Sequence, residues 1–361
     1  MKNTFLLFVL CLLFSASHAS ANTHEIKRVI TKQFNVSAGS ELDINNKYGN
    51  IVINAWNKEV IDFSIEIIGK GDKEKIAQQM ADRVSIDFNQ TGKPSTNPYP
   101  VSAQTNFEQQ RNFNCNNCGT TVNYTVNVPA SVYLNLINKY GNIRLDETTQ
   151  TFKADVKYGN IYASRLSGKD NSIILKYGNL ELGETGKLTL DIKYGNVRID
   201  KIDDWNLNCA YSNLSSTEIG TLRADSKYDN YKIGNIGTLF INTAYSNITI
   251  NQLSDRLEAL SLRYCKVKID GLSENFKAIT IDATYTPVRI NLTNNIIFKA
   301  DLSSHYGNIR TNGLKFSDVT LDDSSDRYTK QIKGIASFGN TGTPTATIKI
   351  ATTYSDIVLS K

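Results

Sequence analysis

Apolar and polar residues alternate along most of this chain, in short runs that meet at a recurring tyrosine. Counted from each tyrosine, apolar side chains occur at positions +3 and +5, as in Ile143 and Leu145 after Tyr140. Before the tyrosine they occur at even offsets, as in Leu190 and Ile192. Alternation with a period of two is typical of a strand with one buried face. Each unit therefore predicts two short strands that meet at the tyrosine.

The tyrosines mark an internal repeat. They recur every 17 to 21 residues, at Tyr140, Tyr158, Tyr177, Tyr194, Tyr211, Tyr228, Tyr245, Tyr264, Tyr285 and Tyr306. The word Lys-Tyr-Gly-Asn begins at Lys47, Lys139, Lys157, Lys176 and Lys193. Because the inward phase changes across the tyrosine, the chain must turn a corner there. We expect the Gly and Asn that follow to supply the positive φ or the local hydrogen bonds of this corner.

A repeat this short cannot bury its own apolar face and must stack on its neighbours. The predicted fold is all-β: a single-stranded parallel β-solenoid, or β-helix, of about ten coils of 17–21 residues with capping segments at both ends. Coils about 4.8 Å apart would place equivalent side chains in ladders. We expect a tyrosine ladder of Tyr140, Tyr158, Tyr177, Tyr194, Tyr211, Tyr228 and Tyr245, and an amide ladder that includes Asn142, Asn160, Asn179 and Asn196. Both are interpreted as structural, since stacked rings and amide hydrogen bonds hold a corner.

The ends of the chain predict its domain organisation and location. Residues 1–21 combine Lys2, an apolar run from Phe5 to Phe14 and the small residues Ala19 to Ala21, which is typical of a secretory signal peptide. The apolar run is shorter than the roughly 20 residues of a membrane span, so no transmembrane anchor is expected. The protein is predicted to be exported, to the periplasm or the outer cell surface.

Three segments follow the predicted signal peptide. Residues 22–135 are expected to form an N-terminal β-rich cap with one short helix near 71–83 and a long loop. Residues 136–312 form the predicted solenoid, and residues 313–361 a C-terminal cap. The loop-rich part at 85–120 is the place where a binding groove could lie.

Composition and cysteines limit the chemistry. A formal charge of +5 is mild for 361 residues and does not favour a nucleic-acid partner. Cys115 and Cys118 have no second pair and no histidine nearby to complete a zinc site, so a local disulfide is expected. Cys209 and Cys265 belong to coils three units apart, too far to be bridged, and are expected to be free thiols. No metal and no cofactor is predicted.

No residue is assigned a catalytic role. His305 is a lone histidine at an outward position, and a solvated side chain is the favoured interpretation. Asp322, Asp323 and Asp326 lack the spacing of a calcium loop and are interpreted as an acidic turn.

The most suggestive outward residues lie four positions after the tyrosines. Stacking would align Arg144, Arg198, Lys232, Lys268, Arg289 and Arg310 into a broken basic stripe. Such a stripe could attract acidic polysaccharide, lipopolysaccharide phosphates or an anionic protein. The competing interpretation is that exposed strands need charge for solubility. A second row, with Asp155, Asp191 and Asp225 beside Lys157, Lys193 and Lys227, is expected to neutralise itself.

With its signal peptide, its Tyr-Gly-Asn coils, the strand Tyr124-Thr-Val-Asn-Val-Pro and the closing Tyr354-Ser-Asp-Ile-Val-Leu, the chain resembles the bacterial adhesin-like family of exported β-solenoid proteins. The likeness spans nearly the whole mature chain and is greatest to the versions found in Bacteroidetes-type envelopes. It implies a solenoid fold and an envelope location, and it offers no catalytic motif to carry over.

Together these observations favour a non-enzymatic, exported adhesin-like or scaffold protein, which presents a repetitive surface to an envelope polysaccharide or protein. Two alternatives remain. One is a β-helix enzyme that cleaves acidic polysaccharide as a lyase or hydrolase, and the other is a periplasmic sensor or regulatory partner.

Overall fold

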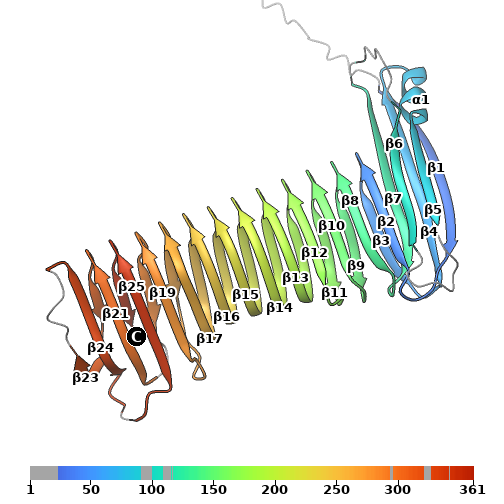
Figure 1. Ribbon diagram of the computed structural model, residues 1–361. Coiled ribbons are helices and arrows are strands. Elements are labelled where there is room, and N and C mark those ends of the chain that lie inside the picture. The colour runs from blue at the N-terminus through green and yellow to red at the C-terminus, as the bar shows by residue number, and fades with distance from the viewer. Residues whose placement is uncertain are drawn as a thin grey trace, which may run out of the picture.

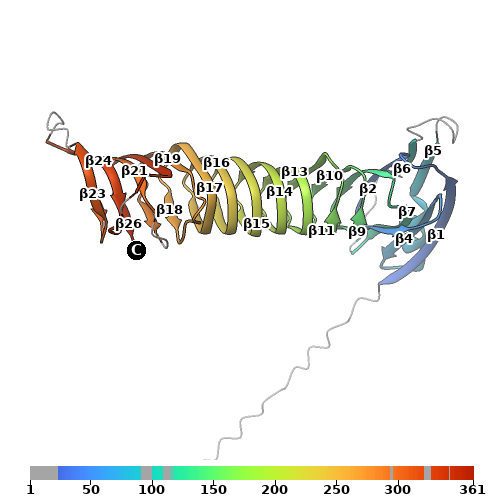
Figure 2. The same ribbon diagram turned by 90° about the horizontal axis from the view of Figure 1, so that it is seen from below.

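The computed structural model describes residues 23–90, 100–108, 115, 117–292, 296–320, 327–340 and 342–361. The predicted signal peptide and the acidic cluster at Asp322, Asp323 and Asp326 lie outside these residues. The described chain is all-β, with 26 strands and one helix. It forms an elongated rod of stacked strands with a wider lobe at the N-terminal end (Figures 1 and 2). This architecture is consistent with the predicted β-solenoid.

The stack begins with a coil that is distant in sequence from the others. Its strands are β2 (Glu41–Lys47) and β3 (Ile51–Trp56), which pair in parallel with β8 (Tyr133–Lys139) and β9 (Ile143–Thr148). The register places Lys47 opposite Lys139 and Ile51 opposite Ile143. The corner at Tyr48 therefore lies directly beside the corner at Tyr140.

The middle of the rod continues this parallel register from coil to coil. Its strands are β10 (Phe152–Lys157), β11 (Ile161–Leu166), β12 (Asn171–Lys176), β13 (Leu180–Lys193), β14 (Asn196–Ala210), β15 (Asn213–Lys227), β16 (Asn230–Ala244) and β17 (Asn247–Arg263). From β13 to β17, each strand continues from the second half of one coil into the first half of the next. The predicted alternation is confirmed: Leu190 lies opposite Leu207, and both are buried between the walls of the rod.

The C-terminal end does not follow the order of the sequence. Its strands are β18 (Lys266–Ile269), β19 (Ala278–Thr284), β20 (Val288–Asn291), β21 (Phe298–His305), β22 (Ile309–Thr311), β23 (Lys315–Thr320), β24 (Thr329–Ser337), β25 (Ala346–Thr353) and β26 (Ile357–Ser360). Strand β25 pairs in parallel with both β19 and β21, and β26 with both β20 and β22. The last coil in the sequence is therefore inserted between two earlier coils.

This insertion differs from the expected cap over residues 313–361. Only β23 and β24 lie beyond the parallel stack, where β24 runs antiparallel to β21 and β23 runs antiparallel to β24. Strands β25 and β26 are internal, and their residues Ile348, Ile350 and Ile357 are buried.

The N-terminal lobe extends the two walls of the rod. Antiparallel strands β1 (His24–Asn35), β4 (Val60–Gly71) and β7 (Gly119–Pro129) continue the wall that contains β3, and β5 (Val84–Gln90) and β6 (Pro100–Phe107) continue the wall that contains β2. The predicted helix is present as α1 (Glu74–Asp82), which buries Ala77, Met80 and Ala81. Among the described residues no helix is long and apolar enough to cross a membrane.

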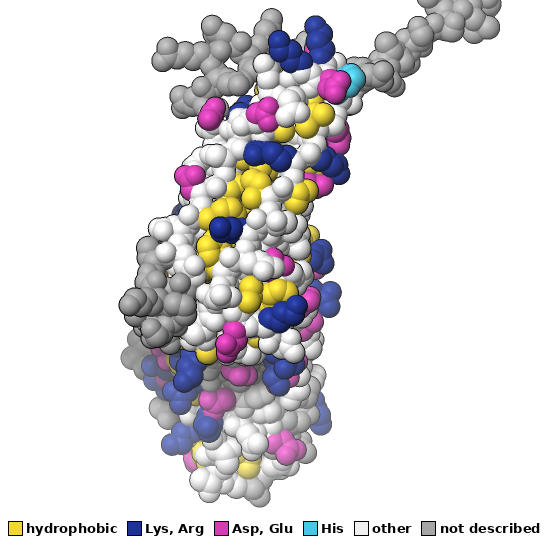
Figure 3. Space-filling view, turned by 90° about the vertical axis from the view of Figure 1, so that its right-hand side faces the viewer, with side chains coloured by type: hydrophobic (Ala, Val, Ile, Leu, Met, Phe, Trp, Pro, Cys, Tyr) yellow, Lys and Arg dark blue, Asp and Glu magenta, His cyan; other side chains and the backbone are white. Residues whose placement is uncertain are grey.

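The outer face of this lobe is mixed in character. Hydrophobic side chains there are interleaved with Lys, Arg, Asp and Glu (Figure 3). Val29 on β1 is exposed, and within the described chain β1 pairs with β4 alone. Charged side chains on an edge strand discourage pairing with other molecules.

Candidate interaction surface

Each coil turns its corner on the repeat tyrosine itself. The tyrosines from Tyr48 to Tyr354 have φ between 50° and 65°, the left-handed region. This corrects the expectation that the following Gly and Asn supply the positive φ. A left-handed conformation costs a non-glycine residue about 1–2 kcal/mol. Backbone hydrogen bonds to the next coil hold it in place, such as the 2.9 Å bond from the Tyr140 N–H to the Lys157 carbonyl.

Glycine after the tyrosine meets a different requirement. A Cβ on Gly159 would overlap the carbonyl oxygen of Gly141, and one on Gly178 would overlap that of Gly159. Only glycine allows the backbones of neighbouring corners to come this close. The close approach continues through the coils of Gly49, Gly141, Gly159, Gly178 and Gly195.

The coils from Ser212 to Thr286 replace this glycine with other side chains, and glycine returns at Gly307. The N–H of Ser212 donates to Asp229 Oδ1 at 2.7 Å, and the N–H of Asp229 donates to Ser246 Oγ at 3.0 Å. The N–H of Cys265 donates to Thr286 Oγ1 at 2.9 Å. In these coils the side chain of one corner accepts a hydrogen bond from the backbone N–H of the preceding corner. This N–H group therefore has a partner although the corner has no glycine.

The tyrosine side chains form one row along the rod. Neighbouring rings from Tyr140 to Tyr285 lie 4.8–5.0 Å apart between centroids, with planes within 13° of parallel. Tyr48 joins the row at one end, and Tyr354 stands between Tyr285 and Tyr306. We call this row the tyrosine ladder. Its side chains are 38–51% exposed, so ring edges and hydroxyls face solvent.

The asparagines two positions after the tyrosines link consecutive corners. The side-chain oxygen of Asn142 accepts the N–H of Asn160 at 2.8 Å, and that of Asn160 accepts the N–H of Asn179 at 2.8 Å. Asn196 continues the row with a 3.0 Å bond from its N–H to Asn179 Oδ1. Backbone N–H groups of the neighbouring corners donate to these side-chain oxygens, so the asparagines have a structural role.

The basic stripe at position +4 is brought together only in part. Register places Lys268 directly beside Arg289, but Val358 separates Arg289 from Arg310 because β26 is inserted there. Three of its cations have a nearby carboxylate: Arg198 with Asp200 at 3.3 Å, Lys268 with Asp270 at 2.7 Å and Arg310 with Asp356 at 3.1 Å. Arg144 lies over the ring of Tyr162. Lys232 and Arg289 of this stripe have no such partner within the described part of the chain.

A second row of cations, one position before the tyrosines, is more continuous. Parallel register places Lys47, Lys139, Lys157, Lys176 and Lys193 opposite one another in consecutive coils. We call this row the lysine ladder. Within the part of the chain that the structure describes, none of the five has a carboxylate within 4.0 Å. Lys47 and Lys157 lie over the rings of Tyr48 and Tyr158.

Sequence reasoning missed the lysine ladder because it paired Lys157 and Lys193 with Asp155 and Asp191 on the same strands. Side chains two residues apart on a strand start about 6.6 Å from each other, whereas parallel neighbours start about 4.8 Å apart. The side chain of each lysine therefore begins closer to that of the next lysine than to that of its own aspartate. The signal that could have revealed the ladder is the repeated word Lys-Tyr-Gly-Asn, because any residue at a fixed offset in a stacked repeat forms a row.

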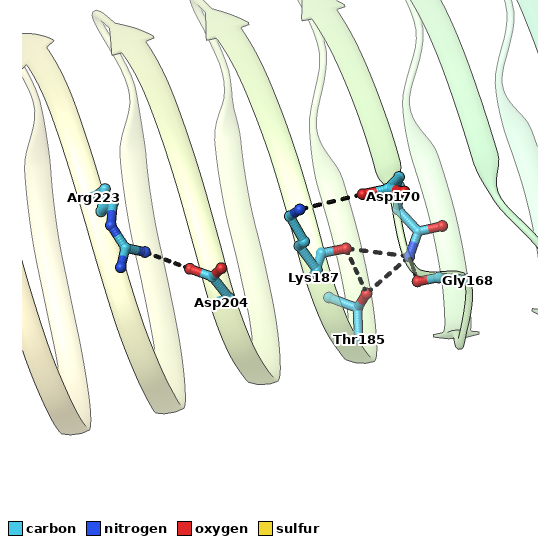
Figure 4. Close-up of polar contacts among 7 residues, drawn as sticks. Gly168, Asp170, Thr185, Lys187, Asp204 and Arg223 are labelled. Atoms are coloured by element: carbon cyan, nitrogen blue, oxygen red, sulfur yellow. Dashed lines mark hydrogen bonds and ion pairs between the residues drawn. The ribbon is translucent and has the colours of Figure 1, made fainter.

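Near the return bends of the coils, by contrast, charges of opposite sign lie beside each other in neighbouring coils. Arg223 contacts Asp204 at 2.6 Å and Lys187 contacts Asp170 at 3.2 Å, in each case between neighbouring coils (Figure 4). Figure 4 also shows Thr185 and Gly168 in the hydrogen-bond network of this return bend.

A shallow groove of about 590 Å³ lies on the outward face of the strands that precede the tyrosines in β13 to β17. Its lining includes Asp191, Arg223, Asp225, Phe240 and Glu258. These residues come from repeat positions of the rod, whereas the groove considered at the sequence level was in residues 85–120, part of which lies outside the described residues.

The described cysteines are of two kinds. Cys115 and Cys118 form a disulfide beside the carboxylate of Asp72. Sulfurs in a disulfide are not thiolates and cannot ligate a metal. Cys209 and Cys265 are free and buried. Burial, and then the nearby charge of Asp229, raise the pKa of the Cys209 thiol, so this side chain is not a reactive thiolate at neutral pH.

His305 is half-buried, in contrast to the solvated side chain expected. Its Nδ1 lies 2.8 Å from the hydroxyl of Thr329, and its ring contacts the edge of Tyr306. The antiparallel strand β24 covers it, which sequence spacing did not reveal.

No family model and no curated protein matches the sequence. The solved structures that match the chain include two of low identity. One is a candidate cell adhesion protein from Clostridium sporogenes, 9% identical, with 93% of this chain and 99% of that chain covered and a TM-score of 0.23. The other is a candidate adhesin from Bacteroides fragilis, 12% identical, with 72% of this chain and 95% of that chain covered and a TM-score of 0.32. A role for this chain has to be inferred from its own residues.

Proposed function

We propose that this chain is a non-enzymatic, exported adhesin-like or scaffold protein of the cell envelope, and that its rod presents a repetitive surface for interaction. The observation that carries the proposal is the tyrosine ladder with the lysine ladder beside it. Both rows are exposed or half-exposed; the tyrosine ladder runs from Tyr48 to Tyr306, and the lysine ladder runs through five neighbouring coils.

A regular row of identical groups suits a partner that is itself extended. The ring spacing of 4.8–5.0 Å repeats the same donor and acceptor hydroxyl many times. No ladder tyrosine hydroxyl has a hydrogen-bond partner among the residues that the structure describes. Each hydroxyl is therefore available to a partner, and many weak contacts along one axis add to a useful affinity.

Export is part of this proposal and is supported by the residue pattern at 1–21. A protein that carries many weak contacts in series and is delivered outside the cytoplasm would meet polysaccharides and proteins of the envelope.

The test uses the full mature chain with purified envelope fractions, and binding is measured by co-sedimentation. We expect binding to the wild-type chain and weaker binding to the triple variant Tyr158→Phe, Tyr177→Phe, Tyr194→Phe, which keeps the stacked rings and removes three hydroxyls. Absence of binding to every envelope fraction would contradict the proposal.

A parallel assay addresses the enzymatic alternative. The chain is incubated with acidic polysaccharides, and new reducing ends and unsaturated ends are measured. We expect no turnover above a heat-denatured control. Reproducible formation of either kind of end would replace the proposed role with a polysaccharide-cleaving one.

A further inference from the structure

We infer that the lysine ladder is a binding site for a linear acidic polysaccharide that lies along the rod axis. This inference rests on the proposed interaction function and names the chemical class of one partner.

The lysine ladder places like charges on neighbouring strands, and among the described residues only Lys47 and Lys157 have a tyrosine ring against them. Like charges directly opposite each other on neighbouring strands destabilise a sheet. Elsewhere on the same coils the chain alternates the signs: Arg165 contacts Glu184 at 3.0 Å, and Lys201 contacts Glu218 at 3.5 Å. Solubility requires charge, and these alternating rows supply it without repulsion. A row of five lysines therefore requires a different explanation, which an anionic ligand provides.

The row is also confined to one part of the rod. After Lys193 the equivalent positions are Ala210, Lys227, Ala244 and Arg263, so the continuous run ends. Five lysines in coils about 4.8 Å apart span about 19 Å. This is a bounded site rather than a general property of the surface.

The geometry fits a single polymer chain. The lysines stand in one file next to the corner, and each directly precedes the tyrosine of its own coil. Ammonium groups would contact carboxylates, and the hydroxyls would exchange hydrogen bonds with the hydroxyls of the sugars. A chain with acidic groups at regular intervals could engage both rows at once.

The same geometry disfavours nucleic acid. Proteins that bind single strands stack bases on open aromatic faces. Here the faces of Tyr158 and Tyr177 are covered by their neighbours in the ladder, and only their edges are open.

A membrane surface is disfavoured for a separate reason. The next outward row on the same strands contains Asp155 and Asp191. An anionic bilayer would cover both rows and repel these carboxylates, whereas a single polymer chain can follow the lysines alone.

The experiment measures binding of fluorescent polygalacturonate fragments, a linear polymer with one carboxylate per sugar, to the full mature chain by anisotropy. The same backbone with its carboxylates methyl-esterified is the uncharged probe. The ladder variant is Lys139→Gln, Lys157→Gln, Lys176→Gln. Its matched control is Lys187→Gln, Lys201→Gln, Lys277→Gln, which removes the same charge from lysines that have carboxylate partners.

We expect the wild type to bind polygalacturonate in a salt-dependent way and to bind the ester far more weakly. The ladder variant should lose affinity on the order of tenfold to a hundredfold, and the control less than about threefold. A third variant, with Lys139, Lys157 and Lys176 each changed to Arg, keeps the charge and should keep binding. It also separates loss of charge from loss of fold, as does the urea midpoint of each variant.

Equal losses in the ladder and control variants would overturn the inference, because attraction would then follow net charge. Absence of polygalacturonate binding at low salt would also overturn it. So would ladder-dependent binding of single-stranded DNA or phosphatidylglycerol vesicles that is tighter than that of the polymer. Envelope binding that survives in the ladder variant would defeat this inference alone, whereas its absence in the wild type would defeat the proposed function.

Discussion

Tyr354 stacks on Tyr285, with ring centroids 4.8 Å apart and ring planes 5° from parallel. On its other side Tyr354 stacks on Tyr306, at 5.0 Å. The coil that contains Tyr354 therefore fills a gap between two coils that are consecutive in sequence. Its removal would separate Tyr285 from Tyr306. It would also leave one edge of each of the strands β19, β20, β21 and β22 without its parallel partner.

This insertion predicts a large cost for truncating a buried side chain of β25. Ile350 is fully buried between the coils of β19 and β21, so Ile350→Ala should lower the free energy of unfolding by about 2–5 kcal/mol. The outward-facing, half-buried Val358 on β26 is the matched control, and Val358→Ala should cost less than about 1.5 kcal/mol. Urea denaturation measures both. Equal effects would show that β25 is not held between two coils.

The glycine row predicts that the position, not the residue type, determines the effect of adding a methyl group. Gly159→Ala should destabilise the chain by about 1–3 kcal/mol, because its Cβ would overlap the carbonyl oxygen of Gly141. At Gly186 the nearest heavy atom to a new Cβ is Asp203 Oδ2, 3.8 Å away. Gly186→Ala should therefore be neutral or stabilising by up to about 1 kcal/mol. Thermal denaturation of both variants is the measurement, and a tolerated Gly159→Ala would contradict the close contact.

Ring stacking, rather than the hydroxyl, should account for the contribution of a ladder tyrosine to stability. Tyr194 stacks on Tyr177 and Tyr211, each 5.0 Å away. Tyr194→Ala removes two ring contacts and should cost about 1–3 kcal/mol, whereas Tyr194→Phe keeps both and should change stability by less than about 0.5 kcal/mol. Urea midpoints compare the two. If the Phe variant were as unstable as the Ala variant, the hydroxyl would have a structural partner.

Asp229 predicts a specific dependence of stability on pH. Burial raises the pKa of its carboxyl above the ordinary value of 3.8, so the folded chain holds this proton more tightly than the unfolded chain. Stability should then fall as the pH rises from the unfolded pKa through the folded pKa. Asp229→Asn keeps an oxygen for the Ser212 N–H and should be more stable than wild type at pH 7, with the difference vanishing below about pH 3.8.

The control for this pH effect is Asp225→Asn, because Asp225 is exposed. Its urea midpoint should follow that of the wild type between pH 3 and 7. A pH-independent difference between Asp229→Asn and wild type would mean that the carboxyl of Asp229 ionises alike in the folded and unfolded chains.

Much of the fold could be predicted from the sequence because a stacked repeat converts spacing into register. The apolar residues at +3 and +5, such as Ile143 and Leu145, define the inward face whatever the details of the corner. The residue with positive φ could not be predicted in the same way, since glycine is the usual choice and tyrosine is not. The close contact between Gly159 and Gly141 uses the glycine for another purpose.

Coil order at the C-terminal end could not be predicted from the pattern. Ile281 on β19 and Leu302 on β21 present equivalent apolar rows, and Ile350 on β25 fits between them as well as beyond them. The lysine ladder was missed for a related reason: Asp155 and Lys157 are two residues apart in the sequence, whereas neighbouring lysines of the ladder are at least 17 residues apart, and Lys47 is 92 residues from Lys139.

The glycine row and the lysine ladder occupy the same coils. Backbone contact between successive corners fixes the interval between the lysine Cα atoms, whereas each ammonium group moves on its own flexible side chain. The lysine side chains therefore begin at one fixed interval, and a polymer whose charges recur near that interval would need the least change of shape to bind. Selectivity among acidic chains would then follow from how readily each one adopts the interval fixed by Gly141, Gly159 and Gly178.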